Sequence, residues 1–344
     1  MSENYKGVNF LPLFRFKVSV MPYIWVGVDA LSNQALTIFV RLFLALHLRS
    51  LLTRGYFFLV VTFLIVLFFF FTNAEYYLIR FLTFFILFSM FYDQFDILPT
   101  KMLESITFKL VLSYFVSLII GVYFLPNIYF DAEGFAGSRG LVYSGNEMSI
   151  AMSVLAFVTA KMYNKHSTTI LMLAFYISLL SLVLIATKLA LIVSLIVIYI
   201  AFNNRYSKNI LLFFLFFFIS MMYLFQRDFS VINIFYMTFT NDSFLDAISS
   251  HRFSRLENFE FSLLPSHTFE NFEIDFVSLL YNAGIFLFII IIPLFLISPF
   301  RNFFYSKNTI LFIVFLSLSG HAFQSIISTP AYALLALFCS RQRK

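Results

Sequence analysis

Long apolar stretches separated by short polar connections run along the whole chain. Two of them, 56–73 and 209–225, carry no charged residue and approach the ~20 residues that a helix needs to cross ~30 Å of hydrocarbon. This pattern predicts helical spans over residues 10–28, 33–48, 56–73, 76–92, 106–125, 146–162, 168–186, 189–202, 209–225, 274–297, 309–326 and 328–339. The first is the weakest, because Arg15, Lys17 and Pro22 interrupt it, and a helix lying in the membrane interface is the alternative there.

The apolar run from 168 to 202 needs a break. As one helix it would be about 52 Å long at 1.5 Å per residue, which exceeds the hydrocarbon core of a bilayer. We therefore predict that one helix ends and another begins at Thr187-Lys188.

Composition excludes an ordinary soluble fold. Hydrophobic residues make up 61% of the 344-residue chain and charged residues 12%, whereas soluble domains are about a quarter charged. A soluble protein of this length could not keep so much apolar surface from water. The single cysteine, Cys339, excludes an internal disulfide and a cysteine-based metal site, and we expect no removable signal peptide.

The basic residues indicate a topology rather than nucleic-acid binding, because the net charge of +6 is spread over the ends of the predicted helices. One set of connections carries Arg49, Arg54, Lys101, Lys109, Lys161, Lys165, Arg205, Lys208, Arg301, Lys307, Arg341, Arg343 and Lys344. The opposite set carries only Arg139, Lys188, Arg227, Arg252 and Arg255. Lys and Arg accumulate in cytoplasmic loops, so the first set and both termini are expected in the cytoplasm.

The fold expected is an all-α polytopic membrane protein with 11–12 transmembrane helices in a single domain, 1–344. Its long outer, periplasmic loop, 226–273, would pack over the helix bundle. Within that loop, segment 250–264 has apolar residues at helical spacing, and Arg252 and Arg255 share one face of it. Two guanidinium groups side by side suit a diphosphate, since each can fork onto phosphate oxygens. A pair of solvated arginines facing Glu257 and Glu260 is the alternative.

Acid–base candidates follow at the end of the loop. His267 precedes the next predicted span, with Glu273 and Asp275 close behind, and a neighbouring carboxylate could orient the histidine for proton abstraction. The alternatives are an ordinary loop histidine and, for Asp275, an acid favoured by the helix dipole.

Four further polar residues stand at the outer ends of predicted helices. Lys188 lies between two apolar runs. A charge in such a place marks a functional site, or else its side chain extends to the membrane–water interface. Arg139 and Asn146 precede and open a helix, and Asn146 has the alternative role of an N-cap. His321 follows Gly320, with a bond to a backbone carbonyl as its alternative. Arg41 inside the second span carries no assigned chemistry.

These positions together resemble the O-antigen polymerase and ligase superfamily over residues 135–340. The stretches that carry the likeness, in the family's order, are Arg139-Gly140 with Gly145-Asn146; Ile185-Ala186-Thr187-Lys188; the loop with Arg252, Arg255 and Ser266-His267 running through Asp275 to Gly284-Ile285; and Gly320-His321 with Ser328-Thr329-Pro330. No glycine loop for nucleotide phosphates, zinc motif or Ser/His/Asp signature is present.

The resemblance implies a metal-independent glycosyltransferase without cofactors, acting on undecaprenyl-diphosphate-linked oligosaccharide in the bacterial inner membrane. Lys188, Arg252, Arg255 and Arg139 would bind the diphosphate; His267, or else Glu273, would be the base, supported by Asn146, Asp275 and His321. The partners implied are the lipid-linked oligosaccharide and the lipid bilayer, with a chain-length regulator left open and no nucleic acid.

The sequence departs from the family pattern at two of these positions. Lys188 replaces the arginine of many members, and Thr268 follows His267 where ligases have asparagine. The second departure favours a polymerase; a ligase that transfers polymer to lipid A-core and a lipid-linked oligosaccharide transporter remain alternatives.

Overall fold

The computed structural model of the chain describes residues 20–28, 75–125, 137–142, 145–202, 299–319, 322–323 and 325–343, with the pairs 262–263, 277–278, 280–281, 284–285 and 288–289. Every regular element in these ranges is a helix, which confirms the all-α prediction for them. The predicted spans 33–48, 56–73 and 209–225 lie outside the described residues, as does Arg41.

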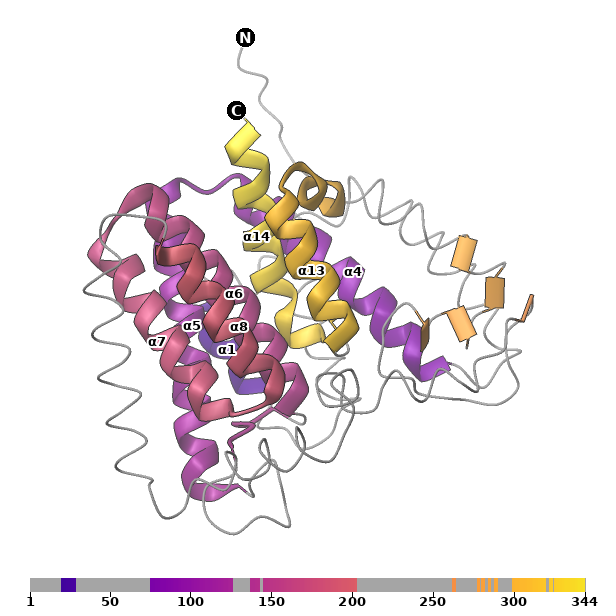
Figure 1. The fold of residues 1–344 in the computed structure, drawn as a ribbon, viewed down its shortest axis with the longest axis horizontal. Helices are drawn as coiled ribbons and strands as arrows, with labels where there is room; N and C mark the ends of the chain where they lie inside the picture. Colours follow the sequence, from indigo (N-terminus) through magenta and orange to yellow (C-terminus); the bar gives the residue numbers. More distant parts are fainter. Residues whose placement is uncertain are drawn as a thin grey trace, which may run out of the picture.

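The described helices form one bundle, with α6 at its centre (Figure 1). Around it lie α5, α7, α8 and α14, and α4 and α13 lie beside α14. The bounds are α4 Glu75–Asp96, α5 Thr100–Phe124, α6 Gly145–His166, α7 Thr169–Ile185, α8 Lys188–Phe202, α13 Lys307–Ser319 and α14 Thr329–Arg343. Every residue of α6 from Met148 to Ala160 is buried, so protein covers all faces of that helix.

Phenylalanine side chains join α4 to the C-terminal part of the chain. Six of them on α4 are buried at spacings of three and four residues: Phe81, Phe84, Phe85, Phe88, Phe91 and Phe95. The Phe88 ring centroid lies 4.7 Å from that of Phe300 in the 3₁₀ helix η3 (Pro299–Tyr305), and Phe84 lies 5.4 Å from Tyr332 of α14. Ring pairs at these separations stabilise a core beyond the area they bury.

The first predicted span is corrected by the structure. Helix α1 covers only Met21–Gly27, so at 1.5 Å per residue it is about 10 Å long, too short to cross a bilayer. Pro22 does not interrupt a longer helix but stands in the first turn of this one, where a missing N–H costs nothing. Residues 10–19 of the predicted span lie outside the described residues.

A buried break separates α13 from α14. The 3₁₀ helix η4 (Ile326–Ser328) is fully enclosed, and α14 follows it with Pro330 in its first turn. The Ile327 carbonyl accepts two hydrogen bonds, from Trp25 Nε1 at 2.9 Å and from the Tyr114 hydroxyl at 2.6 Å. Side chains of α1 and α5 thus satisfy a carbonyl group that no regular helix satisfies.

The described residues within the predicted span 274–297 are helical, and one of them, Gly284, has an irregular backbone conformation. Gly284 has φ +71°, in the left-handed region that glycine adopts without strain. The next amide, Ile285 N–H, donates to the Ser262 carbonyl at 3.0 Å. The backbone is therefore locally irregular at Gly284, and the neighbouring amide of Ile285 bonds to the segment that precedes this span in the chain.

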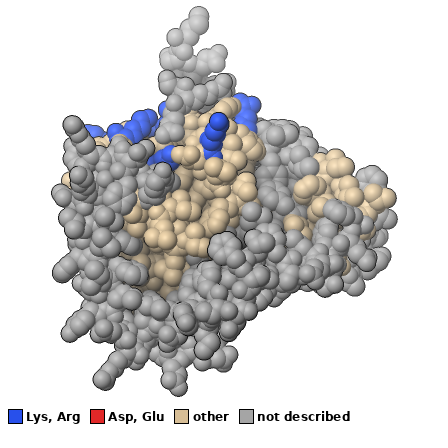
Figure 2. All heavy atoms as spheres, in the orientation of Figure 1, with Lys and Arg blue, Asp and Glu red and all other residues tan. Residues whose placement is uncertain are grey.

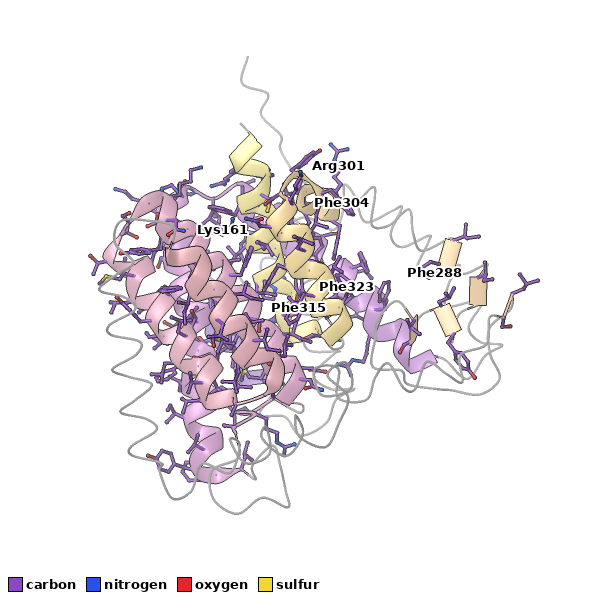
Figure 3. The ribbon with its side chains drawn as sticks, in the orientation of Figure 1. Lys161, Phe288, Arg301, Phe304, Phe315 and Phe323 are labelled. Atoms are coloured by element: carbon purple, nitrogen blue, oxygen red, sulfur yellow. The ribbon has the colours of Figure 1, made fainter. Side chains whose placement is uncertain are left out.

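Basic side chains gather at one end of the bundle, which we call the basic end (Figure 2). The helix bounds place Lys101, Lys161, Lys165, Arg301, Lys307 and Arg341 at this end, at or near the start of α5, the end of α6, η3, the start of α13 and the end of α14. Arg341 Nη2 donates to the carbonyls of Asp96 and Leu98 at 3.1 and 2.9 Å, which joins the end of α14 to the α4–α5 turn. Lys161 and Arg301 both lie toward this end in Figure 3.

The α6–α7 turn lies at the basic end as well. Lys165 Nζ of α6 lies 6.0 Å from the centroid of the Phe338 ring on α14, and the Thr168 hydroxyl donates to Glu104 of α5 at 3.2 Å. Of the larger basic set, Lys101, Lys161, Lys165, Arg301, Lys307 and Arg341 lie at this end, whereas Lys109 lies further along α5.

Within the described residues, α5 is the one helix that is both long and apolar enough to cross a membrane. Shorter apolar helices occur at Thr169–Ile185, Leu189–Ile198, Lys307–Ser317 and Ile326–Arg341. A single long apolar helix fits a membrane span and the core of a soluble protein equally well, so the number of spans belongs to the proposal below.

Removing both donors to the Ile327 carbonyl should cost more than the sum of the single losses. Tyr114→Phe and Trp25→Phe each leave one donor, so each should lower the free energy of unfolding by about 1 kcal/mol. The double variant leaves a buried carbonyl unsatisfied and should lose an additional ~1–2 kcal/mol. Reversible unfolding in mixed micelles measures this, with Tyr123→Phe, an exposed tyrosine, as the control. If the loss in the double variant equalled the sum of the two single losses, the idea that Trp25 and Tyr114 jointly satisfy the Ile327 carbonyl would be contradicted.

Candidate functional site

The structure describes three of the predicted site residues and leaves the others outside. Arg139 and Asn146 are described and half-buried, and Lys188 is described in its backbone as the first residue of α8. The predicted residues outside the description are Arg252, Arg255, His267, Glu273, Asp275 and His321. The candidate site is therefore built from the end of the bundle where the first three lie.

The break predicted at Thr187-Lys188 is confirmed. Helix α7 ends at Ile185, and Ala186 takes the left-handed conformation, with φ 56° and ψ 21°, as its C-cap. Helix α8 begins two residues later, and the Thr187 hydroxyl accepts a hydrogen bond from Ala190 N–H at 3.2 Å, which caps the new helix. The first N–H groups of a helix have no partner within the helix, and no water is at hand inside an apolar bundle. The Thr187 hydroxyl supplies a partner for one of them.

The segment 137–142 docks against this break. Ser138 N–H donates at 3.0 Å to the carbonyl of Leu184, in the last turn of α7, where carbonyls lack partners within the helix. The Ser138 hydroxyl donates to the Leu118 carbonyl of α5 at 3.0 Å, and Leu141 N–H donates to the Ser117 hydroxyl at 2.8 Å. These bonds hold Arg139, between them in sequence, on a fixed backbone.

Two glycines allow the segment to approach α5 this closely. A Cβ atom on Gly121 would lie 2.6 Å from the Gly140 Cα, and one on Gly140 would lie 2.6 Å from the Ser117 hydroxyl oxygen. Gly140 also has φ +62°, which favours glycine. The sequence motif Arg139-Gly140 therefore has a steric reason as well as a chemical one.

The first turn of α6 completes the arrangement. The Ser149 and Thr187 hydroxyl oxygens lie 2.5 Å apart in a buried hydrogen bond, which ties α6 to the break. Helix α6 begins at Gly145, so Asn146 stands inside the first turn and the N-cap alternative for it is wrong. Glu147 follows it, a favourable place for a carboxylate near the positive end of the helix dipole.

An ion pair that sequence analysis missed lies at the same end. Arg80 of α4 pairs with Glu147 through Nη2 and Oε1, and 17% and 14% of the two side chains are exposed. The signal was present, because Arg80 is the one charged residue between Tyr76 and Tyr92. Its partner Glu147 lies 67 positions further along the chain, and the spacing of residues in the sequence does not reveal so distant a contact.

We call this group the break cluster; it comprises Arg80, Ser138, Arg139, Gly140, Glu147, Ser149, Thr187 and the backbone at Lys188. It lies at the end of the bundle opposite the basic end, since α5, α6 and α7 each run from one end to the other. Guanidinium groups on a fixed backbone are suited to binding an anion such as a phosphate.

In the part of the chain that the structure describes, no three His, Cys, Asp or Glu side chains come together as metal ligands. The cluster supplies hydroxyl, amide and guanidinium groups instead. Comparison with protein-family models, curated proteins and solved structures finds no match for this chain.

Gly121→Ala should destabilise the break cluster while Gly27→Ala should not. The added methyl on Gly121 meets backbone atoms of Gly140, so overpacking of about 1–3 kcal/mol is expected. Nothing lies within 4 Å of a Cβ on Gly27, which makes it a matched control. Thermal unfolding of the purified protein compares the two, and an equally stable Gly121 variant would show that the close approach is absent in solution.

Proposed function

We propose that this chain is a polytopic membrane glycosyltransferase that polymerises undecaprenyl-diphosphate-linked oligosaccharide repeats at the periplasmic face of the bacterial inner membrane. The observation that carries the proposal is the docking of the Arg139-Gly140 segment on the Thr187-Lys188 break, through Ser138 N–H and the Leu184 carbonyl. The two stretches that resemble the polymerase family are about 50 residues apart in sequence and adjacent in space.

The orientation follows from charge. Lys and Arg concentrate on the cytoplasmic side of membrane proteins, so the basic end would face the cytoplasm. The break cluster would then face the periplasm, where lipid-linked repeats are polymerised in the family it resembles. The 226–273 loop would leave and re-enter the membrane on that side, and α4 to α8, α13 and α14 would be among 11–12 spans.

The reaction places specific demands on the site. A hydroxyl oxygen of one lipid-linked repeat attacks the anomeric carbon of another and forms the new glycosidic bond. The bond from that carbon to the pyrophosphate oxygen breaks, and its electron pair leaves with the pyrophosphate. The hydroxyl proton passes to a base, for which His267 is the first candidate and Glu273 the second.

Cations are the main requirement, because the leaving pyrophosphate gains negative charge as the bond breaks. Fixed positive groups aimed at it lower the barrier without any reorganisation in the transition state. Lys188, Arg252, Arg255 and Arg139 are the proposed groups, and Asn146, Asp275 and His321 the proposed supporting residues. Arg139 has the strongest structural support of the four, since its backbone is held on both sides by Ser138 and Leu141.

Replacing Arg252 or Arg255 with alanine should leave the protein in the membrane but reduce surface polysaccharide to single repeats, because the diphosphate loses a cation. Gel analysis of lipopolysaccharide from a deletion strain carrying each variant measures this. Arg301→Ala, an exposed arginine at the basic end, is the matched control and should support full-length chains. Long chains in both loop variants would contradict the assignment, and bare core in the deletion strain would indicate a ligase instead.

The proposed orientation predicts opposite labelling of the two ends. In a Cys339→Ala background, Lys165→Cys at the basic end should be blocked from an impermeant maleimide in intact spheroplasts. Tyr123→Cys, an exposed position at the far end of α5, should react within minutes. The reverse pattern would place the break cluster in the cytoplasm and rule out polymerisation there.

A further inference from the structure

The start of α13, at the basic end, carries a positive charge next to an exposed apolar face. Lys307 is exposed, and Leu311 and Val314, which follow it at spacings of four and three residues, are 68% and 46% exposed. Residues so spaced lie on one side of an α-helix. If α13 lies in a bilayer, as proposed above, this side faces lipid, with its lysine at the level of the headgroups and its apolar residues among the acyl chains.

A second lysine reaches the same level from α6. The Phe157 ring of α6 stacks on the Phe312 ring of α13, with the two centroids 4.2 Å apart. Lys161 lies one turn beyond Phe157 toward the basic end, and its Nζ is 5.6 Å from the centroid of that ring. Lys307 lies between one and two turns before Phe312, toward the same end. The two lysines therefore come from different helices to the same end of one aromatic contact.

No acidic residue lies near these lysines along their own helices. Residues 157–166 of α6 and all of α13 contain no Asp or Glu, and among the described residues no hydrogen bond or ion pair holds the Lys161 or Lys307 ammonium. In Figure 2, basic side chains line one edge of a face on which no described acidic side chain is seen, and α13 lies on that face in Figure 1. Each ammonium keeps three N–H donors for an anion.

We propose that Lys161 and Lys307 bind the phosphate of an anionic phospholipid whose acyl chains lie along Leu311 and Val314. Basic sites between membrane helices on the cytoplasmic side bind anionic headgroups in this way. The occupant is a lipid, rather than a free phosphate or an acidic protein, because a charged head with apolar chains complements both the lysines and the exposed apolar face beside them. The inference rests on the membrane placement proposed above and not on the glycosyl transfer.

The competing role of these lysines is orientation alone, in which the negative surface of the leaflet attracts all basic residues of this end together. The two roles differ in what a substitution changes. A delocalised attraction depends on the total charge, so each exposed lysine of the basic end should count equally. A binding site depends on which lysine is lost.

Native mass spectrometry of the full-length protein separates these roles. Protein in micelles is titrated with phosphatidylglycerol, or with phosphatidylcholine as the zwitterionic probe, and the dissociation constant of the first bound lipid is measured. The wild type should bind phosphatidylglycerol more tightly, and Lys161→Gln or Lys307→Gln should each weaken that binding about fivefold. Lys101→Gln is the matched control, an exposed lysine of α5, whose main neighbours are α1 and α7, and it should bind like the wild type.

Conservative and double variants keep the test decisive where a single substitution disturbs folding. Lys161→Arg and Lys307→Arg keep the cation, so each should bind phosphatidylglycerol within about twofold of the wild type. The double variant Lys161→Gln with Lys307→Gln should bind phosphatidylglycerol no more tightly than phosphatidylcholine.

Equal weakening by Lys101→Gln, or a wild type that binds the two lipids equally, would overturn the lipid site and leave the proposed polymerase standing. Long polysaccharide chains in both the Arg252 and the Arg255 variants would reject the polymerase and leave the lipid site standing, because that site requires only that the chain lies in a membrane.

Discussion

Wherever a helix stops inside this apolar bundle, its free backbone groups must find partners from other parts of the chain. Two such places are described, and both are satisfied by polar side chains or turns from distant segments. At η4, Trp25 and Tyr114 share the Ile327 carbonyl. At the α7–α8 break, Ser138 N–H donates a hydrogen bond to the Leu184 carbonyl, and the Thr187 side chain caps the start of α8. The hydrogen bonds that satisfy the second break also assemble the proposed site.

This requirement links stability to function at one end of the molecule. The close approach of Gly121 and Gly140 brings the Arg139 backbone against α5, and the Ser149–Thr187 bond ties α6 to the same place. Positive groups on so fixed a frame can face an anion without the frame having to reorganise. The basic end, by contrast, holds Lys and Arg at helix termini, where orientation in a membrane is the simplest role for them.

Within the described residues, hydropathy was sufficient to predict the long helices but not their ends or their irregular points. Helices α4 and α6 extend past the predicted ends to Asp96 and His166, because polar side chains near a terminus reach water while the backbone stays helical. The break at Thr187 followed from length alone. The short α1, the left-handed Gly284 and the Arg80–Glu147 pair depend on contacts between distant segments, which spacing along the chain does not encode. The loop candidates Arg252, Arg255, His267, Glu273 and Asp275 stay predictions.

The central claim is that a lipid-linked pyrophosphate binds at the break cluster, and photocrosslinking tests it most directly. An undecaprenyl diphosphate analogue with a photoreactive group next to its pyrophosphate would be irradiated with the full-length protein in nanodiscs. The account predicts crosslinked peptides from residues 137–149 and 185–190. Crosslinks confined to η3, the start of α13 and the other elements of the basic end would contradict it.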